Sequence, residues 1–406
     1  MGIKDQNIVL GVSGGIAAYK AVDLLRRLSE AGANVAVVMT YHAQRFVGPL
    51  TFQALTPHGV YTDLFAAYGP GAMDHIRLAQ WANLVVLAPA TANTIAKAAH
   101  GIADDLLSTF LLASSAPKLF CPAMNVHMYE NKVVQSNLEA LRSQGHFILE
   151  PSSGHLACGE EGKGRLPEVS EIVEEVFTIT SPQDLSREKV LITAGGTREF
   201  LDPIRFLGNP ATGKMGFALA RVAKRRGAEV TLVTGPTHLE APSGIKLVPI
   251  TTALEMEREV LKAFPRSTIV IKSAAVSDYR PEKFIPQKVK KKQATFHLPL
   301  VLNPDILHQL GQRKKNQFLI GFAAETEDLL NNAQKKLKEK KLDLIVANPI
   351  GQAGAGFGTD TNQVLLIFAD GRTKALPVMA KEDVAHFIFD YVVRQRGPKH
   401  RGHSEL

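Results

Sequence analysis

The sequence is poor in cysteine, tryptophan and long apolar runs. Its 406 residues include two cysteines and one tryptophan, and aromatic residues make up 7%. Two cysteines cannot staple a chain of this length, so a disulfide-rich extracellular scaffold is excluded. No apolar run approaches the roughly 18 residues that a membrane-spanning helix needs, and the first residues lack a signal-peptide layout. We therefore expect a protein that acts in the cytoplasm, away from membranes.

Charge is distributed unevenly along the chain. The net charge is +8, yet residues 1–188 carry 13 basic and 18 acidic side chains, whereas residues 189–406 carry 34 and 21. A chain this long exceeds what one hydrophobic core usually supports, so two domains are expected. The basic half shows neither interleaved aromatic residues nor a helix-turn-helix or zinc pattern. A small anionic ligand is therefore the rival explanation to a nucleic acid.

Strand and helix patterns alternate in both halves. In the first half, apolar strand patterns cover residues 7–12, 35–39, 84–88, 118–121 and 146–149. In the second half, they cover residues 189–193, 230–233, 268–272, 317–322, 342–347 and 363–368. This alternation is typical of mostly parallel sheets flanked by helices, whose ligands bind at the carboxyl ends of the strands. The sequence therefore predicts an α/β fold with two Rossmann-like domains.

A short polar stretch, residues 178–184, lies between the two halves. We place the boundary near residue 188, which gives domains of residues 1–188 and 189–393. The residues from Arg394 to Leu406 show no periodicity and carry four basic side chains, so we expect a disordered tail there.

Polar and glycine-rich segments follow the predicted strands of the first half. Ser13-Gly14-Gly15 comes after the first strand, where backbone N–H groups and a hydroxyl can approach a phosphate at a helix N-terminus. The spacing is not G-x-G-x-x-G, which counts against a dinucleotide. The loop from Pro89 to Thr94 suits a phosphate or the edge of a flavin ring. Residues 154–165 are rich in glycine around Cys158, which indicates a mobile flap.

Three motifs of the first half are specific enough to compare with known families. They are the loop PATANT at 89–94, PxMNxxM at 122–128 and GxLACGxxGxGR at 154–165. Over residues 5–170 they resemble the flavin-dependent cysteine decarboxylases that act on phosphopantothenoylcysteine. The resemblance implies a flavodoxin-like, homo-oligomeric domain with catalytic residues His75, Asn125 and Cys158. It implies FMN contacts at Ser13, Gly14, Gly15, Thr40, Thr91, Asn93 and Thr94.

The chemistry of decarboxylation agrees with these roles. A cysteine carboxylate is not lost spontaneously, because the carbanion left behind has no electron sink. Oxidation of the cysteinyl C–S unit to a thioaldehyde by FMN would provide that sink, and an acid must later donate a proton. In this interpretation His75 is a base or an orienting group, Asn125 holds the carboxylate, and Cys158 is the acid. The alternatives without a catalytic role are a buried structural His75 and an inert, buried Cys158.

The second half contains a further series of motifs. They cover residues 194–199, 202–205, 209–216, 274–279, 288–291, 303–307 and 321–326. Together, over residues 189–390, they resemble the phosphopantothenate-cysteine ligase domain. The resemblance implies that CTP, with Mg²⁺, activates a carboxylate as an acyl-cytidylate, which the amine of cysteine then attacks.

Transfer of a nucleotidyl group requires cations that bear the developing charge. Lys288 matches the family's essential lysine, and Asn209 matches the asparagine that turns over the acyl-cytidylate. Asp278 would contact the ribose or the cation of the nucleotide. The implied CTP contacts are Ser273, Ala274, Ala275, Asp278, Lys288, Asn303, Pro304, Asp305, Ile306, Phe322, Lys336 and Lys340. Neighbouring lysines such as Lys290 and Lys335 are interpreted as solvated, and no metal ligand is assigned.

The two resemblances together imply a bifunctional enzyme that joins cysteine to 4′-phosphopantothenate and decarboxylates the product to 4′-phosphopantetheine. They also imply a homo-oligomer, a dodecamer of decarboxylase trimers and ligase dimers, without nucleic acid or membrane partners. One alternative is a flavoprotein related to flavin prenyltransferases or peptide-cysteine decarboxylases, with a degenerate second domain. Another is a non-catalytic nucleotide-binding regulator, which would be indifferent to Cys158→Ser.

Overall fold

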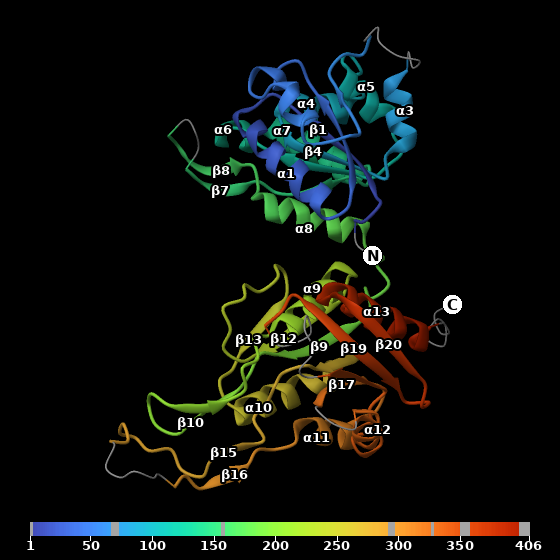
Figure 1. Ribbon diagram of the computed structural model, residues 1–406. Coiled ribbons are helices and arrows are strands. Elements are labelled where there is room, and N and C mark those ends of the chain that lie inside the picture. The colour runs from blue at the N-terminus through green and yellow to red at the C-terminus, as the bar shows by residue number, and fades with distance from the viewer. Residues whose placement is uncertain are drawn as a thin grey trace, which may run out of the picture. The chain divides into compact units, whose positions relative to one another are not determined.

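The chain folds into two compact units, which divide between Ser181 and Pro182 in the computed structural model (Figure 1). The structure describes residues 3–65, 73–155, 159–290, 297–325, 329–349 and 358–397. The division lies before the boundary near residue 188 that the sequence suggests. Residues 182–188 belong to the second unit, because Gln183 Nε2 donates to the Arg225 carbonyl at 2.9 Å and Leu185 is buried in the second core.

A six-stranded parallel sheet forms the centre of the first unit. Its strands lie in the order β3 (Val60–Tyr61), β2 (Asn34–Met39), β1 (Asn7–Val12), β4 (Leu84–Ala90), β5 (Lys118–Pro122) and β6 (Phe147–Ile148). The inner strands are almost entirely buried, as strands covered on both faces are. Because the strand order reverses between β1 and β4, the loops after these strands diverge and open a crevice at their carboxyl ends.

Helices cover both faces of this sheet (Figure 1). They are η1 (Ile16–Tyr19), α1 (Lys20–Glu30), η2 (Ala43–Arg45), α2 (Pro49–Gln53), α3 (Asp74–Trp81), α4 (Ala92–His100), α5 (Leu106–Ala113), α6 (Val126–Glu130), α7 (Lys132–Ser143) and α8 (Val169–Thr180). Helices α1 and α8 bury Leu24 and Ile172 in one face, whereas α4 and α5 bury Ile95 and Phe110 in the other. A separate hairpin, β7 (Ser152–His155) and β8 (Glu161–Arg165), covers the segment where a flap was predicted.

An eight-stranded, mostly parallel sheet forms the centre of the second unit. Its strands lie in the order β13 (Lys246–Pro249), β12 (Glu229–Thr234), β9 (Lys189–Ala194), β14 (Ile269–Lys272), β17 (Phe318–Glu325), β18 (Leu344–Pro349), β19 (Thr361–Phe368) and β20 (Thr373–Ala380). The pairs β18–β19 and β19–β20 are antiparallel. Short hairpins, β10 (Arg198–Phe200) with β11 (Phe206–Gly208) and β15 (Tyr279–Pro281) with β16 (Leu300–Leu302), project from the unit (Figure 1). The predicted α/β fold with two Rossmann-like domains is confirmed.

The helices of the second unit also lie on both faces of its sheet. They are α9 (Lys214–Arg225), α10 (Ala253–Ala263), η3 (Phe264–Arg266), α11 (Ile306–Arg313), α12 (Leu329–Glu339) and α13 (Lys381–Arg396). Helices α9 and α13 share one core with Ile269 and Ile271 of β14. Helices α10, α11 and α12 share the other core with Val270. Side chains of a strand alternate between the faces, so this pattern fixes the face on which each residue of β14 lies.

The end of α13 corrects the prediction of a tail from Arg394. The helix continues to Arg396, whose guanidinium pairs with Glu188 at 3.1 Å and donates to the Thr268 carbonyl at 3.1 Å. The predicted tail is therefore wrong for its first residues, and residues 398–406 lie outside the described part. No helix among the described residues is both long and apolar enough to span a membrane.

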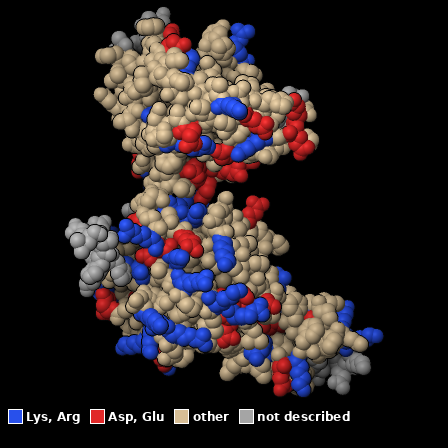
Figure 2. Space-filling model, turned by 180° about the vertical axis from the view of Figure 1, so that it is seen from behind, with Lys and Arg blue, Asp and Glu red and all other residues tan. Residues whose placement is uncertain are grey.

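Basic side chains are concentrated in the second unit. On the face shown in Figure 2, Lys and Arg are much more numerous on the second unit than on the first. The uneven charge of the sequence is thus a difference between two folded units.

Candidate functional site

A cavity of about 850 Å³ opens at the carboxyl ends of the parallel strands in the first unit. Gly14 and Gly15 follow β1, Thr40 follows β2, and Thr91 follows β4. Asn93 and Thr94, in the first turn of α4, also line the cavity, as does Asn125 after β5. All the predicted FMN contacts except Ser13 therefore lie in its wall. Their common position follows from the topology, because parallel strands end at one edge of the sheet.

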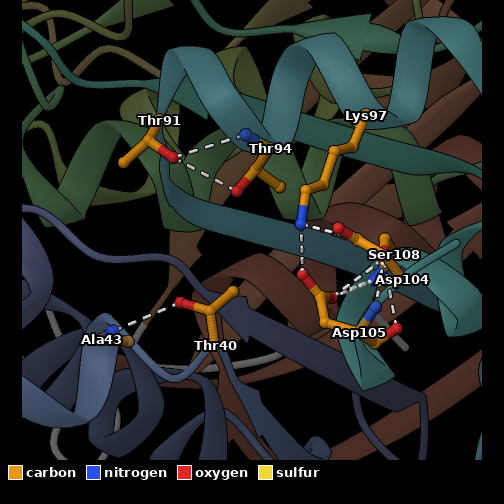
Figure 3. A network of polar contacts seen from close by, with 8 residues as sticks. All are labelled: Thr40, Ala43, Thr91, Thr94, Lys97, Asp104, Asp105 and Ser108. Carbon is orange, nitrogen blue, oxygen red and sulfur yellow. Dashed lines mark hydrogen bonds and ion pairs between the residues drawn. The ribbon is translucent and has the colours of Figure 1, made fainter. Parts of the chain in front are cut away.

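Ser13 lies behind this wall and joins the loops after β1 and β4. Its hydroxyl donates to the Pro89 carbonyl at 2.7 Å and accepts from the Thr91 N–H at 2.9 Å. Thr91 in turn caps α4, because its hydroxyl accepts from the Thr94 N–H at 3.4 Å (Figure 3). A capped helix N-terminus that faces a cavity favours an anion such as a phosphate.

Two glycines allow the close approaches that shape the cavity. A Cβ added to Gly14 would lie 2.3 Å from the Cβ of His42, which is in the loop after β2. A Cβ added to Gly164 of β8 would lie 2.2 Å from the Met124 carbonyl oxygen after β5. Neither position has room for another residue unless its neighbour moves. The flap hairpin thus lies directly against the loop that carries Asn125.

The charged part of this wall is neutralised within the protein. Lys97 Nζ lies 2.6 Å from Asp104 Oδ1 and 2.8 Å from Asp105 Oδ2 (Figure 3). Asp105 also caps α5 by accepting from the Ser108 N–H at 2.8 Å. Burial opposes both charges, but the ion pairs outweigh it, so the pKa of Lys97 is raised and the pKa of Asp105 is lowered. The sequence analysis missed this pair, since no motif links residues of adjacent helices.

The three predicted decarboxylase residues do not all lie in the wall of the first cavity. Asn125 lines the cavity, and its Nδ2 donates to a carboxylate oxygen of Glu160 at 2.6 Å. His75 lies on α3 outside the residues that line the cavity, and its buried Nδ1 has no hydrogen-bond partner among the described residues. Cys158 lies outside the described residues. The flanking hairpin nevertheless contributes His155, Gly164 and Arg165 to the wall.

A second cavity, of about 810 Å³, opens at the corresponding edge of the second unit. Its wall includes Asn209 and all the predicted CTP contacts except Lys288, namely Ser273, Ala274, Ala275, Asp278, Asn303, Pro304, Asp305, Ile306, Phe322, Lys336 and Lys340. Asn209 follows β11, and the others lie in the loop after β14, at the start of α11, within β17, and in or just after α12. Residues more than 60 positions apart in the sequence thus line one cavity.

Hydrogen bonds hold the loops of this cavity in place. Asn303 Nδ2 donates to the Ser277 carbonyl at 2.8 Å, which ties the loop before α11 to the loop after β14. Asp305 caps α11 by accepting from the His308 N–H at 2.9 Å, and it pairs with Lys340 at 2.8 Å. Asn209 Nδ2 donates to the Ala275 carbonyl at 3.3 Å. The amide of Asn209 thus lies beside the loop that follows β14.

Lys288 is exposed and lies outside the wall of this cavity. Its neighbour Val289 is held from both sides: its N–H donates to Asp202 Oδ2 at 3.1 Å, and its carbonyl accepts from Arg205 Nη2 at 2.8 Å. The Arg205 guanidinium, 2.5 Å from the same carboxylate, holds the pKa of the fully buried Asp202 well below its usual range. The motif at 202–205 therefore anchors the segment that carries Lys288.

The cavity also contains lysines that the sequence analysis did not single out, Lys214, Lys272 and Lys381. Lys214 pairs with Asp360 at 2.7 Å, and Lys381 Nζ donates to the Thr361 carbonyl at 3.2 Å. Burial lowers the pKa of Lys381, and the nearby Lys214 adds to this effect. No group of three or more His, Cys, Asp or Glu suited to a metal ion occurs in the described ranges.

The fold defines a two-unit α/β protein with one cavity in each unit, and comparison with known proteins places it among flavoproteins. Residues 2–181 match the Flavoprotein family, and residues 185–395 match the DNA/pantothenate metabolism flavoprotein C-terminal domain. The coenzyme A biosynthesis bifunctional protein CoaBC of Bacillus subtilis is 50% identical over 96% of this chain and 97% of its own. The Escherichia coli K12 protein of the same description is 45% identical over 99% and 100%.

A solved structure of the C-terminal domain of a coenzyme A biosynthesis bifunctional protein CoaBC is also similar. It is 39% identical, covers 53% of this chain and 98% of its own, and has a TM-score of 0.46. The full-length relatives show that the chain belongs to the family of bifunctional coenzyme A biosynthesis proteins. It is a phosphopantothenate-cysteine ligase and a flavin-dependent phosphopantothenoylcysteine decarboxylase on one chain.

Proposed function

We propose that the two activities are divided between the units, with the second unit ligating and the first decarboxylating. In the second unit, CTP activates 4′-phosphopantothenate as an acyl-cytidylate and cysteine then displaces CMP. The first unit, with FMN, converts the resulting 4′-phosphopantothenoylcysteine into 4′-phosphopantetheine. The observation that carries this division is the pair of cavities, each at the carboxyl edge of its own sheet and each lined by one set of predicted contacts.

The charges of the second cavity suit a nucleoside triphosphate. Lys336 lies near the end of α12 and Lys340 just after it, and both line the cavity together with Asp278 and the residues 303–306. Lysines beside a transferring phosphoryl group stabilise the charge that develops on it. Asn209, beside Ala275, would orient the activated carboxylate for attack by the amine. Lys288 would act from the segment anchored by Asp202 and Arg205.

The first cavity fits FMN. Its volume, its hydroxyl side chains and the capped N-terminus of α4 suit a phosphate with a large planar ring system. Bound FMN would supply a hydride acceptor for the substrate's cysteinyl unit. Asn125 Nδ2, which already binds the carboxylate of Glu160, would exchange that partner for the substrate carboxylate. Cys158 would donate a proton, and His75 would act as a base or an orienting group.

Mg²⁺ would enter the second unit together with CTP, since this ion is usually held by substrate phosphates, water and only one or two carboxylates. Both steps would take place in the cytoplasm, without nucleic acid or membrane partners. A homo-oligomer, built as decarboxylase trimers joined through ligase dimers into a dodecamer, is part of the same proposal. Exposed apolar side chains around the first cavity, Ile16, Tyr19, Tyr41 and Met128, support contact with another copy there.

The test is a reaction with the purified full-length chain. Its absorbance spectrum should show a bound flavin, which mass spectrometry after heat release should identify as FMN. Addition of 4′-phosphopantothenate, CTP, Mg²⁺ and cysteine should release pyrophosphate and CO₂. Failure to release either product would contradict the proposal. Replacement of CTP by another nucleotide tests the base preference.

A further inference from the structure

Lys272 lies at the carboxyl end of β14, the strand next to the centre of the second sheet, and lines the second cavity. Alternation along β14 places it on the same face as Val270, over α11 and α12. Its neighbours in register are Thr193 and Gly321. A Cβ added to Gly321 would lie 2.9 Å from Leu307 and from Leu342, so leucine side chains fill the space at this position of β17. The ammonium group is therefore carried to the cavity by a rigid strand.

Among the described residues, this ammonium has no partner of the kind that two other lysines of the cavity have. Lys340 pairs with Asp305 and Lys214 pairs with Asp360. For Lys272, the described residues provide neither an ion pair nor a hydrogen bond. The charged groups around it are Asp305 at the N-cap of α11, Lys340 just after α12 and Asp278 after β14, while Lys336 lines the same cavity from α12. A partly buried ammonium without a partner is costly unless a ligand supplies one.

We propose that Lys272 is a further substrate-binding residue of the ligase site, which binds a phosphate oxygen of a substrate. This inference rests on the proposed function of the second unit. The group is suited to a phosphate because an anion would supply the hydrogen bonds that the described residues do not make to it. Two substrates carry phosphate, the nucleoside triphosphate and 4′-phosphopantothenate, and separate binding measurements distinguish them.

The electrostatic environment gives the proposal a pH signature. Burial lowers the pKa of Lys272 to about 8, and Lys340 adds to this effect, while Asp305 and Asp278 oppose it. Bound phosphate would favour the protonated amine, so binding would take up a proton when the free amine is neutral. The dissociation constant should therefore be flat below about pH 8 and rise by up to tenfold per pH unit above it.

The experiment measures binding of CTP with Mg²⁺, and separately of 4′-phosphopantothenate, to the full-length chain by calorimetry at pH 7.5. Lys272→Met should weaken binding of one of the two by roughly 10- to 100-fold, as expected for a lost hydrogen bond to a charged group. The matched control is Lys335→Met, an exposed lysine outside the cavity, which should bind both ligands as the unaltered chain does.

Thermal unfolding separates binding from a structural role. Because the lowered pKa means that folding disfavours the charged amine, Lys272→Met should unfold at the same temperature or higher while binding more weakly. Lys272→Arg, charged at every pH, should flatten the dependence of the dissociation constant between pH 8 and 9.5. Unchanged binding of both ligands to Lys272→Met would overturn the inference. Absence of CTP binding to the unaltered chain would instead overturn the proposed function.

Discussion

The two cavities occupy the same place in two similar folds, yet their walls differ in net charge. In the first cavity each Lys or Arg of the wall pairs with a carboxylate: Lys97 with Asp104 and Asp105, and Lys20 and Arg165 with Glu168. The second cavity gathers five lysines and two aspartates, Lys214, Lys272, Lys336, Lys340, Lys381, Asp278 and Asp305. The wall of the first cavity is therefore nearly neutral, whereas the wall of the second cavity carries a net positive charge.

We infer from this difference that the topology determines where a site lies, whereas the side chains determine which ligand it binds. Strands that end at one edge leave polar loops there in both units. The first unit uses a capped helix N-terminus and hydroxyl groups, which suit one phosphate and a large ring. The second unit uses lysines, which suit a triphosphate whose charge grows during transfer. Variants that change only one unit can therefore test whether the two sites differ in this way.

The largest effect is expected for Asn209→Ala, which removes an amide beside the Ala275 carbonyl. Loss of one positioned group at a reacting centre costs on the order of 100- to 1000-fold in rate. Ligation should fall by this amount, measured as formation of 4′-phosphopantothenoylcysteine, whereas decarboxylation of that compound should not change. Equal losses in both activities would show that the units do not work independently.

A smaller effect is expected for Gly14→Ala in the first unit. The new Cβ would lie 2.3 Å from the Cβ of His42, so the loop after β1 must move away. Overpacking of this kind costs about 1–3 kcal/mol, which corresponds to roughly 5- to 150-fold weaker flavin binding. Flavin content per chain after purification measures it, and Gly48→Ala, where a Cβ meets nothing within 4 Å, is the control. Full flavin content in Gly14→Ala would contradict the assigned position.

Ser13→Ala should mainly lower the free energy of unfolding of the first unit. The change removes the acceptor of the Thr91 N–H and the donor to the Pro89 carbonyl. Unmade bonds at a buried site cost about 1–3 kcal/mol. Denaturant unfolding should show this loss in the transition of the first unit, while the transition of the second unit stays where it was. A shift of both transitions would indicate that the two units unfold together.

The smallest effect is expected from salt. Lysines open to the second cavity attract a triphosphate through charge, which ions screen, whereas the paired cations of the first cavity contribute little net field. Raising the ionic strength from ~0.05 to ~0.5 M should weaken CTP binding roughly tenfold and FMN binding much less. Equal salt dependence for the two ligands would remove the electrostatic contrast.

Much of this fold could be predicted from the sequence. Strands buried on both faces, such as β1 and β9, are continuous apolar runs, so their positions and the alternation with helices were readable. The hairpins β10–β11 and β15–β16 were missed. Each of their strands has only three residues, and they expose apolar side chains such as Phe206 and Leu302, so no alternating pattern is visible. The end of α13 was missed because Arg396 is held by residues distant in the sequence.

The sites could be predicted only where motifs follow strands. The predicted contacts from Thr91 to Thr94 and from Asn303 to Ile306 are adjacent in the sequence, and each group lines one cavity. Lys272 was missed since a lysine at a strand end carries no motif, and only the structure shows that the described residues offer it no partner. The anchoring of the segment with Lys288 likewise depends on a hydrogen bond between Val289 and Asp202, which are 87 residues apart in the sequence.

The central claim is that one chain holds two separate sites, with the product of the second unit passing to the first. The most direct measurement follows CO₂ release by Asn209→Ala supplied with 4′-phosphopantothenate, CTP, Mg²⁺ and cysteine. Release should be nearly abolished, and addition of 4′-phosphopantothenoylcysteine should restore it to the rate of the unaltered chain. CO₂ release that stays low after this addition would contradict the account.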